Sequence, residues 1–207
     1  MTYGSAKFGS KLAIFVIFPP QDLAQSSVCT LNHLQHCGFS PVVIFNAPLI
    51  PEDLAQLTPI LALIIELANF GYDFAAYRDG LRVVIAKGST IKRLSFLKDG
   101  TWFPITSNDT TLYRREQSDC DMIGHIYKTE VFDDHGREHV ESHLLMFSEK
   151  AVEHPAFLRF WQKYVMSNSK VKTIKNGEKR LSQCMMSAGL RVDGSFSKDS
   201  LVALLRL

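Results

Sequence analysis

Asp99 stands where a carboxylate could do chemistry, because it comes just after the apolar segment Ile91–Leu97 and precedes Gly100. A carboxylate at the end of a strand can hold Mg²⁺ or Mn²⁺, since hard divalent cations prefer oxygen ligands. Such a cation could then neutralise a substrate diphosphate. The alternative is an ordinary turn, because aspartate followed by glycine is common in turns. The spacing fits both interpretations.

A second polar segment, Asn69 to Asp73, precedes a predicted helix. Gly71 would let the backbone approach a ligand closely. Asp73 could cap the helix that it opens, or it could bind a sugar hydroxyl or a base edge. Tyr72 and Phe74 could offer a stacking surface to a ligand. The alternative is a capped helix whose aromatic side chains belong to the core.

A third group of polar residues, His139 to His143, enters an apolar strand. Side chains alternate along a strand, so we expect His139, Glu141 and His143 on one face and Ser142 on the other. A histidine at a strand end could contact a phosphate or act as a base near neutral pH. It could equally be a structural or surface histidine.

Glu178 is the one acidic residue of a basic segment, Lys170–Arg180, which we expect to be a loop. Nearby cations favour the charged form of a carboxylate, and Glu178 could act as the base for a hydroxyl nucleophile. It could instead cap the following helix. The cations could hold a phosphorylated donor or an anionic acceptor, or form a solvated face.

Other sites are disfavoured by the remaining residues. The four cysteines include no CxxC pair, the histidines form no zinc-site pattern, and we expect reduced thiols. A net charge of +2 and a pI of about 8.3 are too weak to indicate nucleic-acid binding. No apolar run approaches the length of a membrane-spanning helix.

Alternating strands and helices are predicted for the first half of the chain. The predicted strands are Lys11–Phe18, Pro41–Phe45, Ile60–Leu67 and Ile91–Leu97, and the predicted helices are Asp22–Cys37, a short one behind Pro51, and Asp73–Lys87. This order indicates a parallel sheet covered by helices on both faces. Ligands bind such sheets at the carboxyl ends of the strands, which brings Asn46, Asn69–Asp73 and Lys98–Thr101 to one rim.

The second half is less regular, and we expect it to add antiparallel strands to the sheet. The predicted elements are strands Met122–Lys128 and Val140–Phe147, an acidic turn from Glu130 to Glu138, helices Ala151–Val165 and Leu181–Ala188, and an apolar tail Leu201–Leu207 that packs down. The fold class is therefore α/β, a mainly parallel central sheet with an antiparallel addition. Residues 1–207 are expected to form a single domain.

Several segments together resemble the rhamnan synthesis protein F family, a group of glycosyltransferase-like proteins. They are Gly71–Phe74 with Tyr77 and Gly80-Leu81, Phe96–Pro104, His139–Phe147, Phe157 with Phe160-Trp161, and Gly177-Glu178 with Leu181–Gln183. Each segment is short, but their order and spacing extend from about Lys11 to Leu190.

This resemblance implies a GT-A-like fold that binds a nucleotide-diphospho-sugar and transfers its sugar, rhamnose being the expected one, in cell-surface polysaccharide synthesis. Residues 1–105 would be the donor-nucleotide-binding half and residues 106–207 the acceptor side. The implied catalytic residues are Asp99, Glu178 and His139, with Asp99 also the ligand of a Mg²⁺ or Mn²⁺ ion. The implied donor-binding residues are Asn69, Gly71, Asp73 and Lys98.

Four positions depart from the family pattern: Lys98 replaces Asn, Gly100 replaces Ser, Leu67 replaces Arg and Glu141 replaces Gln. Lys98 could bind the diphosphate directly and make a metal dispensable. It could also neutralise Asp99 in a protein that has lost catalysis. The alternative function is therefore a degenerate module of the same fold that binds a nucleotide sugar or a glycan.

A third interpretation is an unrelated α/β enzyme such as a phosphate-ester hydrolase, although GxSxG, P-loop and GxGxxG motifs are missing. The expected partners are a nucleotide-sugar donor and a glycan or lipid-linked glycan acceptor, and no nucleic acid. The expected location is the cytoplasm. The basic segment and the apolar tail could also touch the inner face of a membrane.

Overall fold

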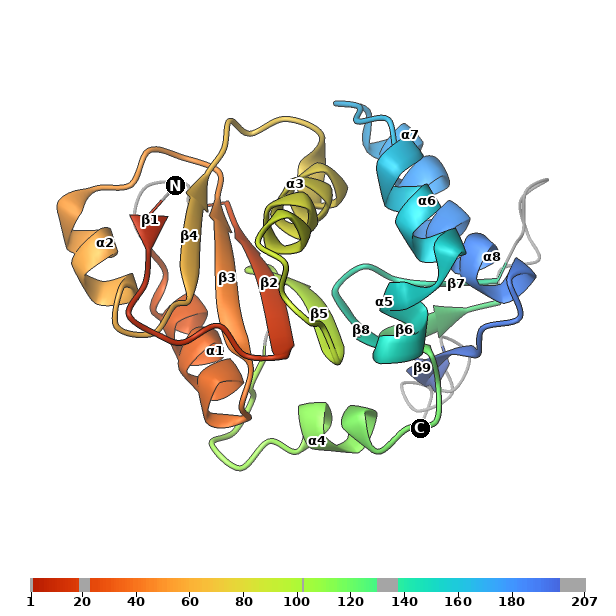
Figure 1. Ribbon diagram of the computed structural model, residues 1–207, viewed down its shortest axis with the longest axis horizontal. Helices are drawn as coiled ribbons and strands as arrows, with labels where there is room; N and C mark the ends of the chain where they lie inside the picture. Colours follow the sequence, from red (N-terminus) through yellow and green to blue (C-terminus); the bar gives the residue numbers. More distant parts are fainter. Residues whose placement is uncertain (1, 19–22, 102, 130–137, 198–207) are drawn as a thin grey trace, which may run out of the picture.

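The computed structural model describes residues 2–18, 23–101, 103–129 and 138–197 (Figure 1). Within these ranges the strands join one mixed sheet in the order β1-β4-β3-β2-β5-β8-β6-β7, and β9 pairs with β6. The strands are β1 (Thr2–Tyr3), β2 (Lys11–Ile17), β3 (Ser40–Phe45), β4 (Leu63–Glu66), β5 (Arg93–Lys98), β6 (Met122–Lys128), β7 (His139–Val140), β8 (Leu144–Ser148) and β9 (Val192–Ser197).

The helices fall into two groups. In the first half they connect the strands: α1 (Gln25–His36), α2 (Pro51–Leu57) and α3 (Tyr72–Ala86). The rest are α4 (Thr111–Glu116), α5 (Glu149–Glu153), α6 (Pro155–Lys163), α7 (Lys170–Thr173), the π-helix η1 (Ile174–Lys179) and α8 (Arg180–Ser187). The predicted α/β class is confirmed, since β4, β3, β2 and β5 pair in parallel.

Helices cover both faces of the parallel strands, as the fully buried side chains of β2 show. Ile14 packs in one core cluster with Phe74 and Tyr77 of α3. Its neighbour Phe15 packs in the other cluster with Leu31 of α1. Successive side chains of a strand point to opposite faces, so a strand that is apolar throughout needs helices on both sides.

The antiparallel addition is also confirmed, but it contains a break. β8 pairs antiparallel with β5, and β6 pairs antiparallel with both β7 and β8. The prediction of one continuous strand over Val140–Phe147 is wrong, because Glu141–His143 lie outside β7 and β8, and of these three Glu141 alone donates a backbone hydrogen bond to β6, to the carbonyl oxygen of Ile126. From Gly124 to Tyr127 the partner strand runs from Leu145 back to Val140, so two additional residues bulge out of the pairing.

Two helix predictions need correction. The helix expected over Ala151–Val165 is divided into α5 and α6, and His154, just before Pro155, accepts a hydrogen bond from the Ala156 N–H. The segment expected to be a basic loop is helical, as α7 followed by η1. Ser169 caps α7 by accepting a hydrogen bond from the Lys172 N–H. Gly177 lets η1 pack against α3, because a Cβ there would lie 2.8 Å from the ring of Phe74.

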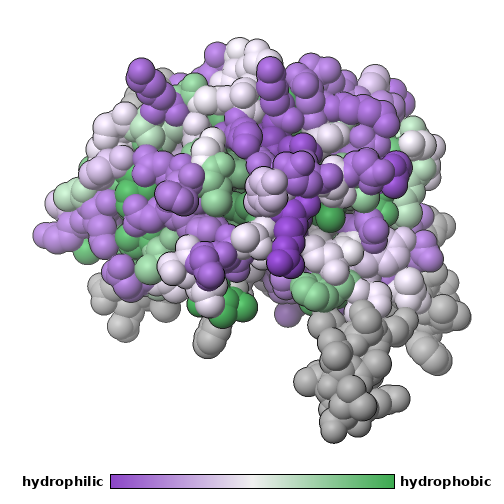
Figure 2. All heavy atoms as spheres, turned by 90° about the horizontal axis from the view of Figure 1, so that it is seen from below, coloured by the Kyte–Doolittle hydropathy of each residue, from purple (hydrophilic) through white to green (hydrophobic). Residues whose placement is uncertain are grey.

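Some predicted details fall outside the described residues: the cap at Asp22, the acidic turn over residues 130–137 and the tail over residues 201–207. Among the described helices, none combines the length and the apolar character that crossing a membrane requires. Figure 2 shows the face seen from below Figure 1 as mainly hydrophilic, with hydrophobic groups in small separate areas. Contact with a membrane surface stays a prediction.

Candidate functional site

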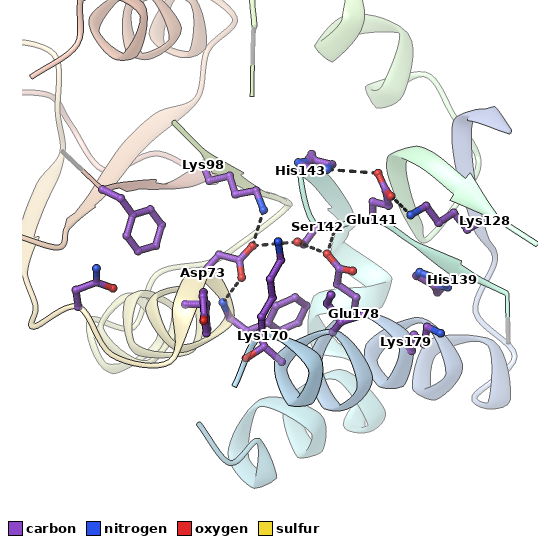
Figure 3. Close-up of a pocket in the computed structure, with 16 residues that line it drawn as sticks. Asp73, Lys98, Lys128, His139, Glu141, Ser142, His143, Lys170, Glu178 and Lys179 are labelled. Carbon is purple, nitrogen blue, oxygen red and sulfur yellow. Dashed lines mark hydrogen bonds and ion pairs between the residues drawn. The ribbon is translucent and has the colours of Figure 1, made fainter. Parts of the chain in front are cut away.

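A cavity of about 730 Å³ lies between the ends of the parallel strands and the irregular segments of the second half. Phe18 follows β2, Lys98 ends β5 and Asn69 follows β4, and all three line the cavity. Its charged and imidazole groups are Asp73, Glu141, Glu178, Lys98, Lys128, Lys170, Lys179, His139 and His143 (Figure 3). The expected position of a ligand site, at the carboxyl ends of the parallel strands, thus coincides with a cavity.

Ser142 connects the two carboxylates at the centre of the cavity. Its Oγ lies 3.0 Å from Oδ2 of Asp73 and 2.5 Å from Oε1 of Glu178 (Figure 3). Its backbone N–H also donates to Oε1 of Glu178 at 3.0 Å. A hydroxyl group has a single hydrogen to donate, so the side chain of Ser142 can serve one carboxylate at a time.

Lys98 extends this chain of polar contacts on the side of the parallel strands. Its Nζ lies 2.9 Å from the same Oδ2 of Asp73 that faces Ser142. Figure 3 also shows Lys170 directed from α7 toward this part of the cavity. Cations and carboxylates that alternate in this way can hold an anionic group and accept a proton within a few ångströms of each other.

The start of α3 positions Asp73. The N-cap is Gly71, which has a φ of +82°, and not Asp73 as predicted; Tyr72, the next residue, has a φ of +57°. A left-handed conformation suits glycine and is uncommon for a tyrosine. The Gly71 N–H donates to Oδ1 of Asn168 at 2.7 Å, which fixes the turn. Asp73 therefore lies in the first helical turn, where the helix dipole stabilises a negative charge.

The π-helix η1 positions Glu178. Gly177 packs against Phe74, so the next residue is held close to α3. Ser182 adds a second link, because its Oγ donates to the carbonyl oxygen of Glu178 and accepts from the N–H of Val140, both at 3.1 Å. Short π-helical segments often occur at functional sites.

Tyr77 supports Ser142 from below. Its side chain is completely buried, and its hydroxyl donates to the carbonyl oxygen of Ser142 at 3.3 Å. Burial, together with the negative charges of Asp73, Glu178 and Asp99, raises the pKa of Tyr77 well above its ordinary value. Tyr77 therefore remains a neutral donor and holds the segment between β7 and β8 in place.

Glu141 forms a separate charged group at the rim of the cavity. It pairs with Lys128 and lies 3.3 Å from Nε2 of His143. The hydrogen bond with His143, opposed by burial and assisted by Lys128, lowers the pKa of Glu141 to about 2. The rim thus carries an ionised carboxylate whose charge is compensated by its neighbours.

The structure places most of the predicted residues around one cavity. Asn69, Asp73, Lys98, His139 and Glu178 all line it, so residues from both halves of the chain meet there. Gly71 is not among the residues that line the cavity, and it forms the turn before α3. The expected alternation of His139 to His143 does not hold, because the strand ends at Val140, and His139, Glu141, Ser142 and His143 all line the cavity.

Asp99 does not line the cavity. Its Oδ2 accepts a hydrogen bond from the N–H of Phe18 at 2.6 Å, which joins the ends of β2 and β5. Within the described ranges no three His, Cys, Asp or Glu residues gather into a group able to hold a metal ion. A catalytic or metal-binding role of Asp99 stays a prediction.

Sequence reasoning did not foresee the central position of Ser142 or the support from Tyr77 and Asn168. The polar run around Ser142 was a visible signal, but regular alternation placed this side chain on the wrong face. Asn168 had no signal, since its partner Gly71 is far away in the chain.

The fold and the cavity define an α/β protein with a charged site at the ends of its parallel strands. Residues 42–204 match the family described as Rhamnan synthesis protein F, which is most of the chain, and the chain belongs to this family. It is also similar to the uncharacterized protein y4gN of Sinorhizobium fredii (strain NBRC 101917 / NGR234), with 30% identity over 204 residues. That alignment covers 98% of this chain and 52% of the relative, so the chain spans about half of the relative's length.

Among solved structures, the chain is similar to the glycosyltransferase GlyE of Streptococcus pneumoniae TIGR4, with a TM-score of 0.44, 13% identity, and coverage of 90% of this chain and 45% of GlyE. For S. aureus TarS 1–349 the TM-score is 0.40 and the identity is 12%, and the similarity covers 69% of this chain and 48% of TarS. For a cytidylyltransferase from Leptospira borgpetersenii the TM-score is 0.43 and the identity is 11%, and the similarity covers 93% of this chain and 77% of the cytidylyltransferase. With TM-scores this low, none of these similarities defines a function for the chain.

Proposed function

We propose that the chain is a glycosyltransferase-like protein that transfers a sugar from a nucleotide-diphospho-sugar to a glycan acceptor. The observation that carries the proposal is the contact of Ser142 with both Asp73 and Glu178, beside Lys98, at the end of the parallel strands. It supplies a carboxylate base and a fixed cation within one cavity. Membership of the family supports a role in rhamnan-type polysaccharide synthesis, with rhamnose as the proposed sugar.

In this proposal the donor diphosphate binds to the lysines of the cavity. Lys98 and Lys170 extend into it from opposite sides (Figure 3). Negative charge develops on the diphosphate as the sugar leaves, and fixed cations stabilise that charge most strongly in the transition state. Asn69 and Asp73 would then bind polar groups of the donor, and Gly71 would shape the turn that presents them.

The acceptor hydroxyl needs a base, and we assign this role to Glu178. Its Oε1 is oriented by two hydrogen bonds from Ser142, one from the backbone N–H and one from the hydroxyl. A base oriented in this way can take a proton from a hydroxyl group within hydrogen-bond distance. His139 lines the same cavity and is the alternative base.

The side chains at Asp99 fit a protein-held divalent cation poorly. One oxygen of Asp99 already accepts a hydrogen bond from the Phe18 N–H, and among the described residues Asp99 belongs to no group of three or more His, Cys, Asp or Glu side chains that could hold a metal ion. Mg²⁺ is often held by one or two carboxylates and substrate phosphates together. We therefore propose that Lys98, and not a metal ion held by Asp99, neutralises the diphosphate.

A binding module without catalysis is the second candidate. It is favoured by the ion pair of Lys98 with Asp73, because this pair engages the lysine that would otherwise bind the diphosphate. It would bind a nucleotide sugar or a glycan without turnover.

Thermal unfolding of the full chain with a panel of nucleotide sugars, with and without Mn²⁺, tests donor binding. A ligand at 100 times its Kd stabilises by about 2.7 kcal/mol, which for a chain of this size raises Tm by about 5–10 °C. We expect one donor to give this shift, Lys98→Gln to lose it, and Lys92→Gln, at an exposed position, to retain it. A Tm shift that requires Mn²⁺ and is lost in Asp99→Ala would instead support Asp99 as a metal ligand. If no donor shifts Tm, the proposal is wrong.

Transfer assays separate the enzyme from the binding module. Glu178→Gln should lower the rate by about 10²–10⁴-fold while leaving the donor shift intact, because it removes the base and not the cations. Glu153→Gln, at an exposed position on α5, is the control. A donor shift without transfer by the native chain would favour the binding module. Hydrolysis of generic phosphate esters without nucleotide preference would contradict both.

A further inference from the structure

A second cavity, of about 340 Å³, lies on the other side of η1 from the first. It is formed between α6 and the helical stretch from η1 into α8, which pack together (Figure 1). Asn176 and Arg180 line this second cavity, whereas Ile174, Glu178 and Lys179 line the first. One short helical segment thus separates two cavities.

The charge of this second cavity is entirely positive among its described lining residues. Arg159 and Lys163 extend from α6, and Arg180 extends from the start of α8. Within the described chain these three cations form no ion pair. All three are exposed to solvent, so they are available to a ligand.

The spacing of these residues places them in two pairs, each on one side of its helical segment. Arg159 and Lys163 are four residues apart on α6, and Asn176 and Arg180 are four residues apart across the junction of η1 and α8. Residues four apart lie on the same side of a helix, and like charges in this arrangement repel. Arg159 and Lys163 therefore repel each other on α6, and an anion bound in the cavity would relieve this repulsion.

We infer that this second cavity binds a ligand through a phosphate or diphosphate group. Two of the three cations are arginines, whose planar guanidinium groups match the geometry of phosphate oxygens. The Asn176 amide offers a further donor, and Phe160 provides a buried apolar surface beside the cations. A volume of about 340 Å³ suits a small ligand or the charged end of a larger one.

The inference does not depend on the proposed transfer reaction. Its test is titration of the full chain with inorganic pyrophosphate, followed by NMR of the arginine Nε–H and asparagine side-chain signals. The test variant is Arg159→Gln with Arg180→Gln. The control is Lys172→Gln with Lys175→Gln, which removes the same charge from exposed positions outside both cavities. Lys98→Gln reports binding in the first cavity.

We expect pyrophosphate to shift the signals of Asn176 and Arg180, and the test variant to weaken this binding by about tenfold or more. The control pair should change it less than about twofold. Vesicles containing phosphatidylglycerol identify the source: binding that the test variant loses indicates a lipid headgroup, and its absence beside pyrophosphate binding indicates a soluble or glycan-linked phosphate. The inference is wrong if Lys98→Gln removes all pyrophosphate binding, a result that would still be consistent with the proposed donor site in the first cavity. It is also wrong if the control pair weakens pyrophosphate binding as much as the test variant does.

Discussion

The two walls of the large cavity are built in different ways. The regular wall consists of Asp73 and Lys98, which stand at the start of α3 and the end of β5. The irregular wall consists of Ser142 and Glu178, which stand in the break between β7 and β8 and in the π-helix η1. Regular elements place side chains by their period, whereas irregular ones place them by local packing. The irregular wall should therefore be more sensitive to small changes.

The largest effect is expected at Gly177, which lets η1 approach α3. Gly177→Leu would force its side chain into the ring of Phe74, and we expect a loss of about 3 kcal/mol in the free energy of unfolding. Denaturant unfolding measures this loss. Gly100→Leu is the control, because no atom lies within 4 Å of a Cβ at that position. Equal losses in the two variants would mean that the close packing of Gly177 against Phe74 does not account for the destabilisation.

Ser142→Ala tests the contact between the two walls. It removes the hydroxyl from two carboxylates, and we expect the free energy of unfolding to fall by about 2 kcal/mol. Ser95→Ala is a matched control, because Ser95 is equally buried but its hydroxyl has no partner in the described structure. That change should be neutral or slightly stabilising. A neutral Ser142→Ala would show that the walls do not depend on this contact.

Tyr77→Phe tests the support under the irregular wall. The change keeps the ring, which stacks on Phe96 at 4.6 Å, and removes only the hydrogen bond to Ser142. We expect a loss of about 1 kcal/mol, measured by denaturant unfolding. Tyr113→Phe, at an exposed tyrosine, should leave stability unchanged. A loss of the same size in both variants would contradict the role of the Tyr77 hydroxyl.

The smallest effect concerns pH at the rim. The pKa of Glu141 is about 2 in the folded chain and ordinarily 4.5, so ionised Glu141 stabilises the fold above pH 4.5. This contribution, below about 1 kcal/mol for a partly exposed pair, is lost as pH falls from 4.5 toward 2. Unfolding measured across this range should show a smaller pH dependence for Glu141→Gln than for Glu153→Gln. Identical slopes would contradict the assignment.

The regular wall could be predicted from the sequence because periodicity determines it. Apolar segments gave the parallel strands, and the rule that ligands bind at strand ends brought Asn69, Asp73 and Lys98 together. The start of α3 was correct to within one residue. The antiparallel addition was also predicted, because its two segments are apolar and separated by polar residues.

The irregular wall could not be predicted because it depends on contacts between distant residues. Nothing local indicates that strand pairing is interrupted after Glu141 and that Ser142 lies in the cavity. The composition of Lys170–Arg180 indicates a loop, whereas the segment is helical and packs its Gly177 against Phe74, a contact between residues far apart in the chain. Glu178 was named as a candidate from its residue type, but its distance to Asp73 required the structure.

The pairing of Asp73 with Glu178 through Ser142 has a consequence for how the chain folds. The parallel strands and α3 are complete by Lys98, so during synthesis they can associate before the second wall exists. Closing the cavity then requires a long chain segment to return to α3, which costs loop entropy. In a nascent chain we therefore expect Asp73 and Lys98 to lack Ser142 and Glu178 as neighbours until the segments that carry them have been made, so the cavity forms after the parallel strands.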